Sequence, residues 1–234
     1  MRLAVVIAVS ALVTACSQSV GGEAESSESP APTPTTASSP APTPSATPVP
    51  GSGAPAADAS IDEVIGWVEA ATPVDAGGFH VAFRDGVTTR LGDDIAFVSP
   101  SGAPHSTTQC LTDARLADGA LTCLLELTDP APPPTQTEGM WKPGWISFSG
   151  TTLTVGSLRG DPGPFVNGTG TELAAGQSMA FGDNRCRSDA SGLYCVNYAH
   201  RAAVRVAADG IVPFGCLAEV TPPADVTASI AYSC

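Results

Sequence analysis

The chain has 234 residues, a formal net charge of −13 and 43% hydrophobic residues. Lys and Arg together number 10 against 23 Asp and Glu, which argues against nucleic acid or anionic lipid headgroups as partners, because both bind through basic surfaces. The acidic balance permits a basic protein or a cation as partner, and the alternative explanation is ordinary solubility.

Residues 1–15 have the pattern of an export signal. Arg2 precedes an apolar run over 3–13, which is shorter than the roughly 20 residues that a membrane span needs. The segment VTAC (13–16) then resembles a lipobox, in which small residues precede the cleavage site and the Cys16 thiol accepts a diacylglyceryl group. We therefore expect lipidated Cys16 to anchor the chain in the outer face of the cell membrane, facing the cell wall. The alternative is an ordinary secretory signal with an incidental Cys16.

Residues 16–58 continue from Cys16 as a stretch rich in Pro, Ala, Ser and Thr, without aromatic residues or apolar periodicity. Such a composition cannot bury enough surface to offset its ordering entropy, so we expect a disordered stalk. In polyproline conformation about 40 residues reach up to roughly 120 Å. Whether the stalk is O-glycosylated or a plain spacer stays open.

Residues 59–234 are expected to form one mainly β domain, with antiparallel hairpins in a sandwich or a barrel. The segment 61–71 is the one stretch with a helical pattern, and Ser60 with Glu63 predicts a capping box at its start. Short runs of β-branched and aromatic residues between Gly- and Asp-rich turns predict strands. These runs are 79–84, 94–99, 107–112, 121–128, 145–150, 152–158, 178–182, 193–199, 202–206 and 210–216.

Six cysteines follow Cys16, and two segments repeat one pattern of Cys, any residue, hydroxyl, Asp, turn, Gly, apolar run and Cys. The Asp and Gly suit a tight turn, after which the two cysteines face each other across antiparallel strands. The pattern predicts the hairpin disulfides Cys110–Cys123 and Cys186–Cys195. By elimination, Cys216 and Cys234 form a third pair.

Other chemistry for these cysteines finds less support. Zinc sites and redox centres favour close C-x-x-C pairs, and the chain has none. An exported chain with an even number of cysteines favours structural disulfides. No cofactor or metal site is predicted.

The segments SPSG (99–102), CLTD with GALTC, DPGPFVNGTGTEL (161–173) and the run from 181 to 216 carry a resemblance. In this order they resemble the LppI-like exported lipoproteins of mycobacteria and related actinobacteria, a family without an established activity. The tail that ends at Cys234 lies outside the shared pattern. The resemblance implies a cell-envelope lipoprotein and supplies no mechanism.

Catalytic motifs are missing from the sequence. The three histidines are His80, His105 and His200, and a Ser-His-Asp set built from Ser99 or Ser101 would need one of them nearby. The sequence gives no reason to expect these side chains to lie close together, so we do not expect the chain to be an enzyme.

Trp141 and Trp145 in GMWKPGWISF (139–148) are the strongest candidates for ligand contact. Alternation along a strand would place both indoles on one face, where they could stack on sugar rings or anchor a protein. The competing interpretation is that both are core residues covering the sheet.

Three functions follow from these observations. The first is a lipid-anchored, non-enzymatic binding or scaffold protein of the envelope, with an envelope protein or cell-wall glycan as partner. The second is an inhibitor of a secreted basic hydrolase such as lysozyme, based on the acidic charge and the loop 191–194. The third is a hydrolase acting on the cell wall, which would require carboxylates or a Ser, a His and an Asp converging in one cleft.

Overall fold

The computed structural model describes residues 53–134, 139–159, 161–224 and 226–234. The predicted export signal, Cys16 and most of the predicted stalk lie outside the described residues. The described residues begin at 53, before the predicted domain boundary at residue 59. One of these earlier residues contacts the domain, because the Tyr194 hydroxyl donates to the Pro55 carbonyl oxygen at 3.5 Å. Within the described residues, no helix is long and apolar enough to cross a membrane.

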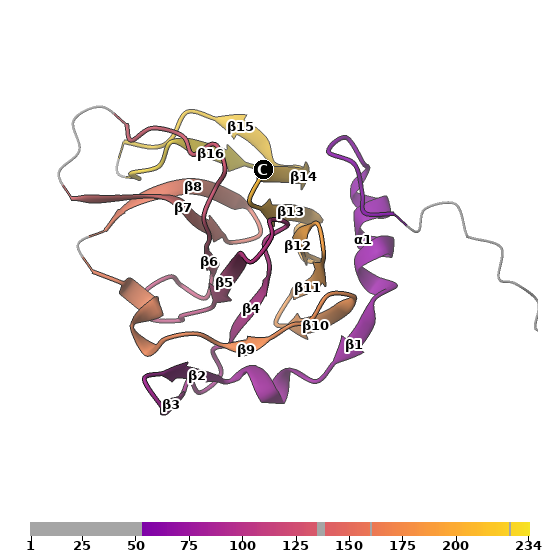
Figure 1. Ribbon diagram of the computed structural model, residues 1–234. Coiled ribbons are helices and arrows are strands. Elements are labelled where there is room, and N and C mark those ends of the chain that lie inside the picture. The colour runs from indigo at the N-terminus through magenta and orange to yellow at the C-terminus, as the bar shows by residue number, and fades with distance from the viewer. Residues whose placement is uncertain (1–52, 135–138, 160, 225) are drawn as a thin grey trace, which may run out of the picture. The chain divides into compact units, whose positions relative to one another are not determined.

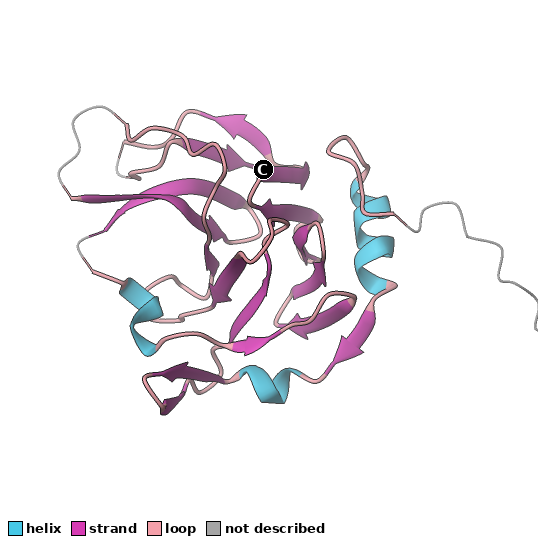
Figure 2. Ribbon diagram, viewed as in Figure 1, coloured by secondary structure: helices cyan, strands magenta, loops and turns pink. Residues whose placement is uncertain are grey.

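Two large sheets dominate the domain (Figures 1 and 2). The six-stranded sheet has the order β1-β10-β11-β12-β13-β14, and the eight-stranded sheet has the order β15-β16-β8-β7-β6-β5-β4-β9. The strands of the first are β1 (Thr72–Val74), β10 (Gln177–Phe181), β11 (Asn184–Asp189), β12 (Gly192–Asn197), β13 (Ala202–Ala207) and β14 (Gly210–Gly215). Those of the second are β4 (Ala96–Pro100), β5 (Thr107–Leu111), β6 (Leu121–Leu124), β7 (Met140–Phe148), β8 (Thr152–Arg159), β9 (Thr171–Glu172), β15 (Ala218–Val220) and β16 (Ile230–Ser233).

Smaller elements complete the described chain. The helix α1 (Ile61–Glu69) precedes β1, and the short 3-10 helices η1 (Ala76–Phe79) and η2 (Gly163–Asn167) lie in connections. A separate hairpin pairs β2 (Val81–Arg84) with β3 (Val87–Arg90).

The two large sheets share one hydrophobic core. Phe97, Ile146 and Leu153 from the eight-stranded sheet belong to the same buried cluster as Met179 and Val204 from the six-stranded sheet. The mainly β fold with a short N-terminal helix is therefore confirmed, in its sandwich form.

The barrel alternative is wrong, because neither sheet closes on itself among the described strands. The two end strands of the six-stranded sheet each contain a proline, Pro73 in β1 and Pro213 in β14. Proline has no N–H to donate to a neighbouring strand, which opposes closure of the sheet through these edges.

The helix α1 covers the outer face of the six-stranded sheet. Val64, Trp67 and Val68 pack against a cluster that includes Tyr194 and Phe214. Trp67 and Tyr194 have ring centroids 4.7 Å apart, and Arg187 stacks over the Trp67 ring at 3.5 Å. The apolar spacing along the helix thus matches the face it buries.

The capping box at the start of α1 is confirmed. The Ser60 hydroxyl accepts from the Glu63 N–H at 3.3 Å, while the Glu63 carboxylate accepts from the Ser60 N–H at 2.8 Å. The hydrogen bond from the Ser60 backbone, followed by that from its hydroxyl, lowers the pKa of Glu63.

Replacing this cap should weaken the domain measurably. We expect Ser60→Ala to lower the free energy of unfolding in urea by about 1 kcal/mol at neutral pH. The pKa of Glu63 is lower in the folded state than in the unfolded state. The stabilisation that its ionised carboxylate contributes is therefore present above the unfolded-state pKa of about 4.3, and it is lost as the pH falls through the folded-state pKa. The difference in the free energy of unfolding between wild type and Ser60→Ala should therefore be smaller in acid than at neutral pH.

Gly66→Ala provides the control, since an added Cβ at this helical position meets nothing within 4 Å. It should stabilise the domain by about 0.5–1 kcal/mol at either pH. Because Ser60→Ala keeps the backbone N–H, an equal difference at neutral and acid pH would contradict a contribution from the hydrogen bond between the Ser60 hydroxyl and the Glu63 carboxylate.

All three predicted disulfides are present. Cys110 faces Cys123 across β5 and β6, and Cys186 faces Cys195 across β11 and β12, with one hairpin in each sheet. These four cysteines are at most 1% exposed and belong to the shared core. The two hairpin disulfides therefore lie in the single core between the sheets.

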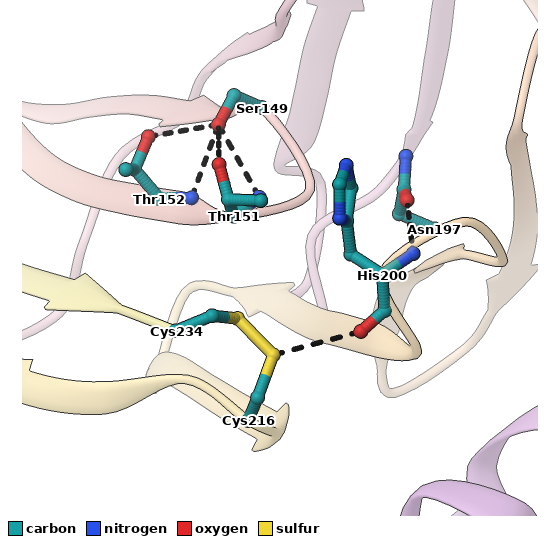
Figure 3. Close-up of a disulfide and its surroundings, with 7 residues drawn as sticks. All are labelled: Ser149, Thr151, Thr152, Asn197, His200, Cys216 and Cys234. Carbon is teal, nitrogen blue, oxygen red and sulfur yellow. Dashed lines mark hydrogen bonds between the residues drawn. A yellow bond between two sulfur atoms is a disulfide. The ribbon is translucent and has the colours of Figure 1, made fainter.

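The third disulfide, Cys216–Cys234, is exposed and ties the C-terminus down (Figure 3). The Cys234 N–H donates to the Thr151 carbonyl oxygen at 3.0 Å, and the Cys216 sulfur lies 3.6 Å from the His200 carbonyl oxygen. The chain end thus contacts the β7–β8 turn of one sheet and the β12–β13 turn of the other.

Candidate functional site

A groove of about 780 Å³ lies over β5, β6 and the start of β7, and Trp141 lines it. Gln109 is paired with Leu124, and each is next to a core cysteine in its strand. Because side chains alternate along a strand, both face the outer side of the sheet, away from the core. Lys142 and Glu126 add one cation and one carboxylate to the lining.

The groove depends on a β-bulge in β7. The register between β7 and β8 shifts between Lys142 and Ile146, across Pro143 and Gly144. A Cβ on Gly144 would lie 1.9 Å from the Leu125 carbonyl oxygen, so the β7 backbone approaches β6 more closely than any side chain allows. The Leu125 N–H donates to the Gly144 carbonyl oxygen at 3.2 Å, which holds this approach.

Trp141 is half-buried and fixed on two sides. Its Nε1–H donates to the Ala131 carbonyl oxygen at 3.2 Å. Its ring packs on the backbone of Gly156, where a Cβ would lie only 2.3 Å from the ring. A fixed, partly exposed indole is suited to stacking on a flat or apolar ligand face at low entropic cost.

Trp145 does not share that role. It is 4% exposed, Phe165 packs edge-on against its ring at a centroid distance of 5.2 Å, and the Arg159 guanidinium lies 4.0 Å from the ring centroid. The two indoles therefore do not form one exposed surface, and the predicted pair is corrected to Trp141 alone. The physical reasons are the bulge between them and the η2 segment, which brings Phe165 over Trp145.

Among the described residues, no ion pair lies in the groove. The ion pairs found among the described residues are Arg84–Asp85, Arg201–Asp62 and Arg205–Asp209, all elsewhere. Lys142, the single lysine of the chain, therefore has no carboxylate within 4.0 Å in the described part.

The three histidines lie apart in the chain and take part in different contacts. His80 Nδ1 lies 2.8 Å from the Asp94 carbonyl oxygen, His105 is exposed at the rim of the groove, and His200 is exposed in the β12–β13 turn. Ser99 and Ser101 are at most 1% exposed. The Ser99 hydroxyl contacts the Pro100 carbonyl oxygen at 3.4 Å, and no hydrogen bond in the described part joins either serine to a histidine.

A second groove of about 520 Å³ gathers acidic side chains, including Asp94 and Asp113. Both carboxylates are already hydrogen-bonded. Asp94 accepts from the Thr112 hydroxyl at 3.0 Å and from the Ala114 N–H at 3.1 Å, and Asp113 accepts from two backbone N–H groups at 2.8 Å each. Across the described residues, no group of three or more His, Cys, Asp or Glu side chains is placed to hold a metal ion.

A third groove, of about 770 Å³, lies between α1 and the segment before it, and Arg187 lines it. The Arg187 guanidinium stacks on Trp67 and also donates to the Trp67 carbonyl oxygen. Burial is the main cause of the lowered pKa of Arg187, against the opposing effect of Asp189. One guanidinium N–H thus serves the attachment of α1, while the Nε–H has no hydrogen-bond partner among the described residues.

The loop behind the hydrolase-inhibitor hypothesis is largely inside the domain. Gly192, Leu193 and Tyr194 are buried in β12, and Tyr194 packs under α1. A loop that inserts into an enzyme cleft must project, and these residues do not.

Several groove residues escaped prediction. Gln109 and Leu124 lie in the strands that carry core cysteines, and alternation along those strands predicts their outward direction. Glu126 lies just after β6, where strand alternation gives no prediction. No protein family, no curated protein and no solved structure matches this chain. The resemblance to LppI-like lipoproteins therefore stays a prediction.

Proposed function

We propose that this chain is a lipid-anchored, non-enzymatic binding protein of the cell envelope, and that its groove at Trp141 binds cell-wall glycan. The export signal and Cys16 support the anchor, and the stretch up to residue 52 supports a spacer. Three disulfides fit an oxidising compartment outside the cytoplasm.

The observation that carries the proposal is the composition of the groove. A half-buried indole lies beside Lys142, Glu126 and the Gln109 amide, so one apolar face is surrounded by hydrogen-bonding groups of both kinds. Sugar rings present an apolar face and a rim of hydroxyl and amide groups, which is the complementary arrangement. The lone ammonium of Lys142 adds a partner for the carboxylates of wall polymers.

Sedimentation with purified peptidoglycan sacculi tests this function. The mature chain carrying Cys16→Ser, which stays unlipidated, should pellet with sacculi, and soluble chitooligosaccharide should compete. Trp141→Ala should weaken binding by about 30-fold, the loss expected for a central aromatic contact of about 2 kcal/mol. Leu116→Ala is the matched control, because Leu116 is 67% exposed and lies outside the groove.

Two results would reject the glycan assignment. One is a wild-type chain that stays in the supernatant with sacculi, and the other is equal binding by wild type and Trp141→Ala. Selective loss of an envelope protein from Trp141→Ala pull-downs, without glycan binding, would assign the groove to a protein partner instead.

A further inference from the structure

The two large sheets contain the same arrangement of strands. Strands β4 to β8 form an antiparallel meander in which each strand pairs with the next, and strands β10 to β14 form another. Each meander carries one buried disulfide between its second and third strands. Each also has one short parallel strand beside its first strand, β9 beside β4 and β1 beside β10.

The registers of the two meanders match along the row that contains the disulfide. One continuous row of directly paired residues crosses each sheet at its disulfide. In the first meander the row is Phe97, Cys110, Cys123, Ile146 and Val155, and in the second it is Met179, Cys186, Cys195, Val204 and Pro213. Every member of both rows except Pro213 lies in the one shared core.

The parallel strands are exchanged between the halves. Strand β1 precedes the first meander in the chain but pairs with the second, where Val74 is opposite Met179. Strand β9 precedes the second meander but pairs with the first, where Thr171 is opposite Phe97. Since Phe97 and Met179 occupy equivalent places, Val74 and Thr171 do as well.

We propose that the domain is a fused pair of equivalent units, residues 53–159 and 161–234, and that each unit is the partner that completes the other's sheet. The interaction surface comprises the exchanged strand and the inner face of the meander, with α1 added by the first unit and β16 by the second. A second copy of this chain carries the same surface, so its units fit in trans. This inference is independent of the proposed function.

Covalent links do not hold the two units together apart from the backbone at residue 160. Cys110–Cys123 lies in the first unit, and both other disulfides lie in the second. The contacts between the units include the parallel pairs, the β8–β16 pair, the shared core and the seat of α1. They also include the Trp145–Phe165 ring contact and the Arg201–Asp62 ion pair.

The approach of β9 to β4 is especially close. A Cβ on Gly170 would lie 1.9 Å from the carbonyl carbon of Ala96 and 2.2 Å from the Phe97 nitrogen. Real Cβ atoms do not come this near to backbone, so Gly170→Ala must push β9 away from β4. This substitution places the clash where the exchanged strand meets the edge of the first meander.

Cleavage of the full chain between the units tests the proposal. A protease site is inserted immediately before Asp161 in the mature Cys16→Ser chain. After cleavage we expect one species of unchanged mass by light scattering, although non-reducing denaturing gels show two fragments. Separated in urea with disulfides intact and then mixed, the fragments should regain the near-ultraviolet circular dichroism of the uncut chain, and a fragment from a tagged second copy should be incorporated equally.

Variants in the cleaved chain locate the interaction. Gly170→Ala should raise the dissociation constant of the two fragments by about 10-fold or more. Leu116→Ala, at a side chain that is 67% exposed, should leave it unchanged. The uncut chain taken through the same urea cycle shows whether refolding is efficient under these conditions.

The proposal is overturned if the cleaved fragments separate under native conditions, or if mixed fragments stay unfolded while the uncut chain refolds. It is also overturned if Gly170→Ala does not weaken their association.

Discussion

Removing the buried disulfide by Cys186→Ala with Cys195→Ala is expected to lower the free energy of unfolding by about 4 kcal/mol. The bridge closes a loop over a sequence separation of 9, for which the loss of loop-closure entropy is worth about 3 kcal/mol. The remainder arises because both sulfur atoms are fully buried in the core, so their removal leaves cavities. Urea unfolding monitored by circular dichroism measures the change.

The exposed bridge provides the comparison. Cys216→Ala with Cys234→Ala removes a bridge of separation 18 without opening a cavity, so we expect only the closure effect of about 3 kcal/mol. A mild phosphine reductant applied to the native protein should reduce this bridge first, because Cys110, Cys123, Cys186 and Cys195 are out of reach in the core. Mass spectrometry after alkylation that found the buried pairs reduced first would contradict the placement of the disulfides.

Trp145→Ala is the substitution with the other large expected effect. Trp145 is 4% exposed and holds together Phe165 from η2 and Arg159 from β8. Its loss should cost about 3–5 kcal/mol in the free energy of unfolding, as for other buried aromatic residues. It should also release η2 from the sheet, which hydrogen exchange in residues 163–167 would report.

Trp141→Ala is the matched comparison four positions away. Because Trp141 is half-buried, its truncation should cost about 2 kcal/mol or less and leave η2 protected. Ligand binding should show the opposite order, with Trp141→Ala impaired at temperatures where the domain is folded. Equal destabilisation by the two substitutions would argue that both indoles are core residues.

The groove and the seat of α1 lie on different sheets. Trp141 and Lys142 belong to the eight-stranded sheet, whereas α1, the first described helix, packs on the six-stranded sheet. In the proposed function, a ligand held at Trp141 therefore does not have to displace the helix through which the anchor joins the domain.

Local patterns were the reliable part of the sequence. The cap formed by Ser60 and Glu63 spans three positions, and each hairpin disulfide joins cysteines on either side of a turn whose Asp and Gly are visible in the chain. Most predicted strands are present within a few residues, because alternation and turn residues act between near neighbours. These features depend on interactions that close within one helix turn or one hairpin.

Distant contacts decided the rest. The strands β1 and β9 are too short to stand out from their neighbours, and each exists because a meander strand far along the chain offers it a parallel partner. The same holds for Trp145, whose burial depends on Phe165, and for the groove, which needs β5, β6 and the bulge of β7 together. The sequence by itself determined the turns, the cap and the cysteine pairs. The tertiary structure alone decided which outward-facing side chains are covered and which remain exposed. That outcome depends on packing between segments that are far apart in the chain, and no local pattern relates them.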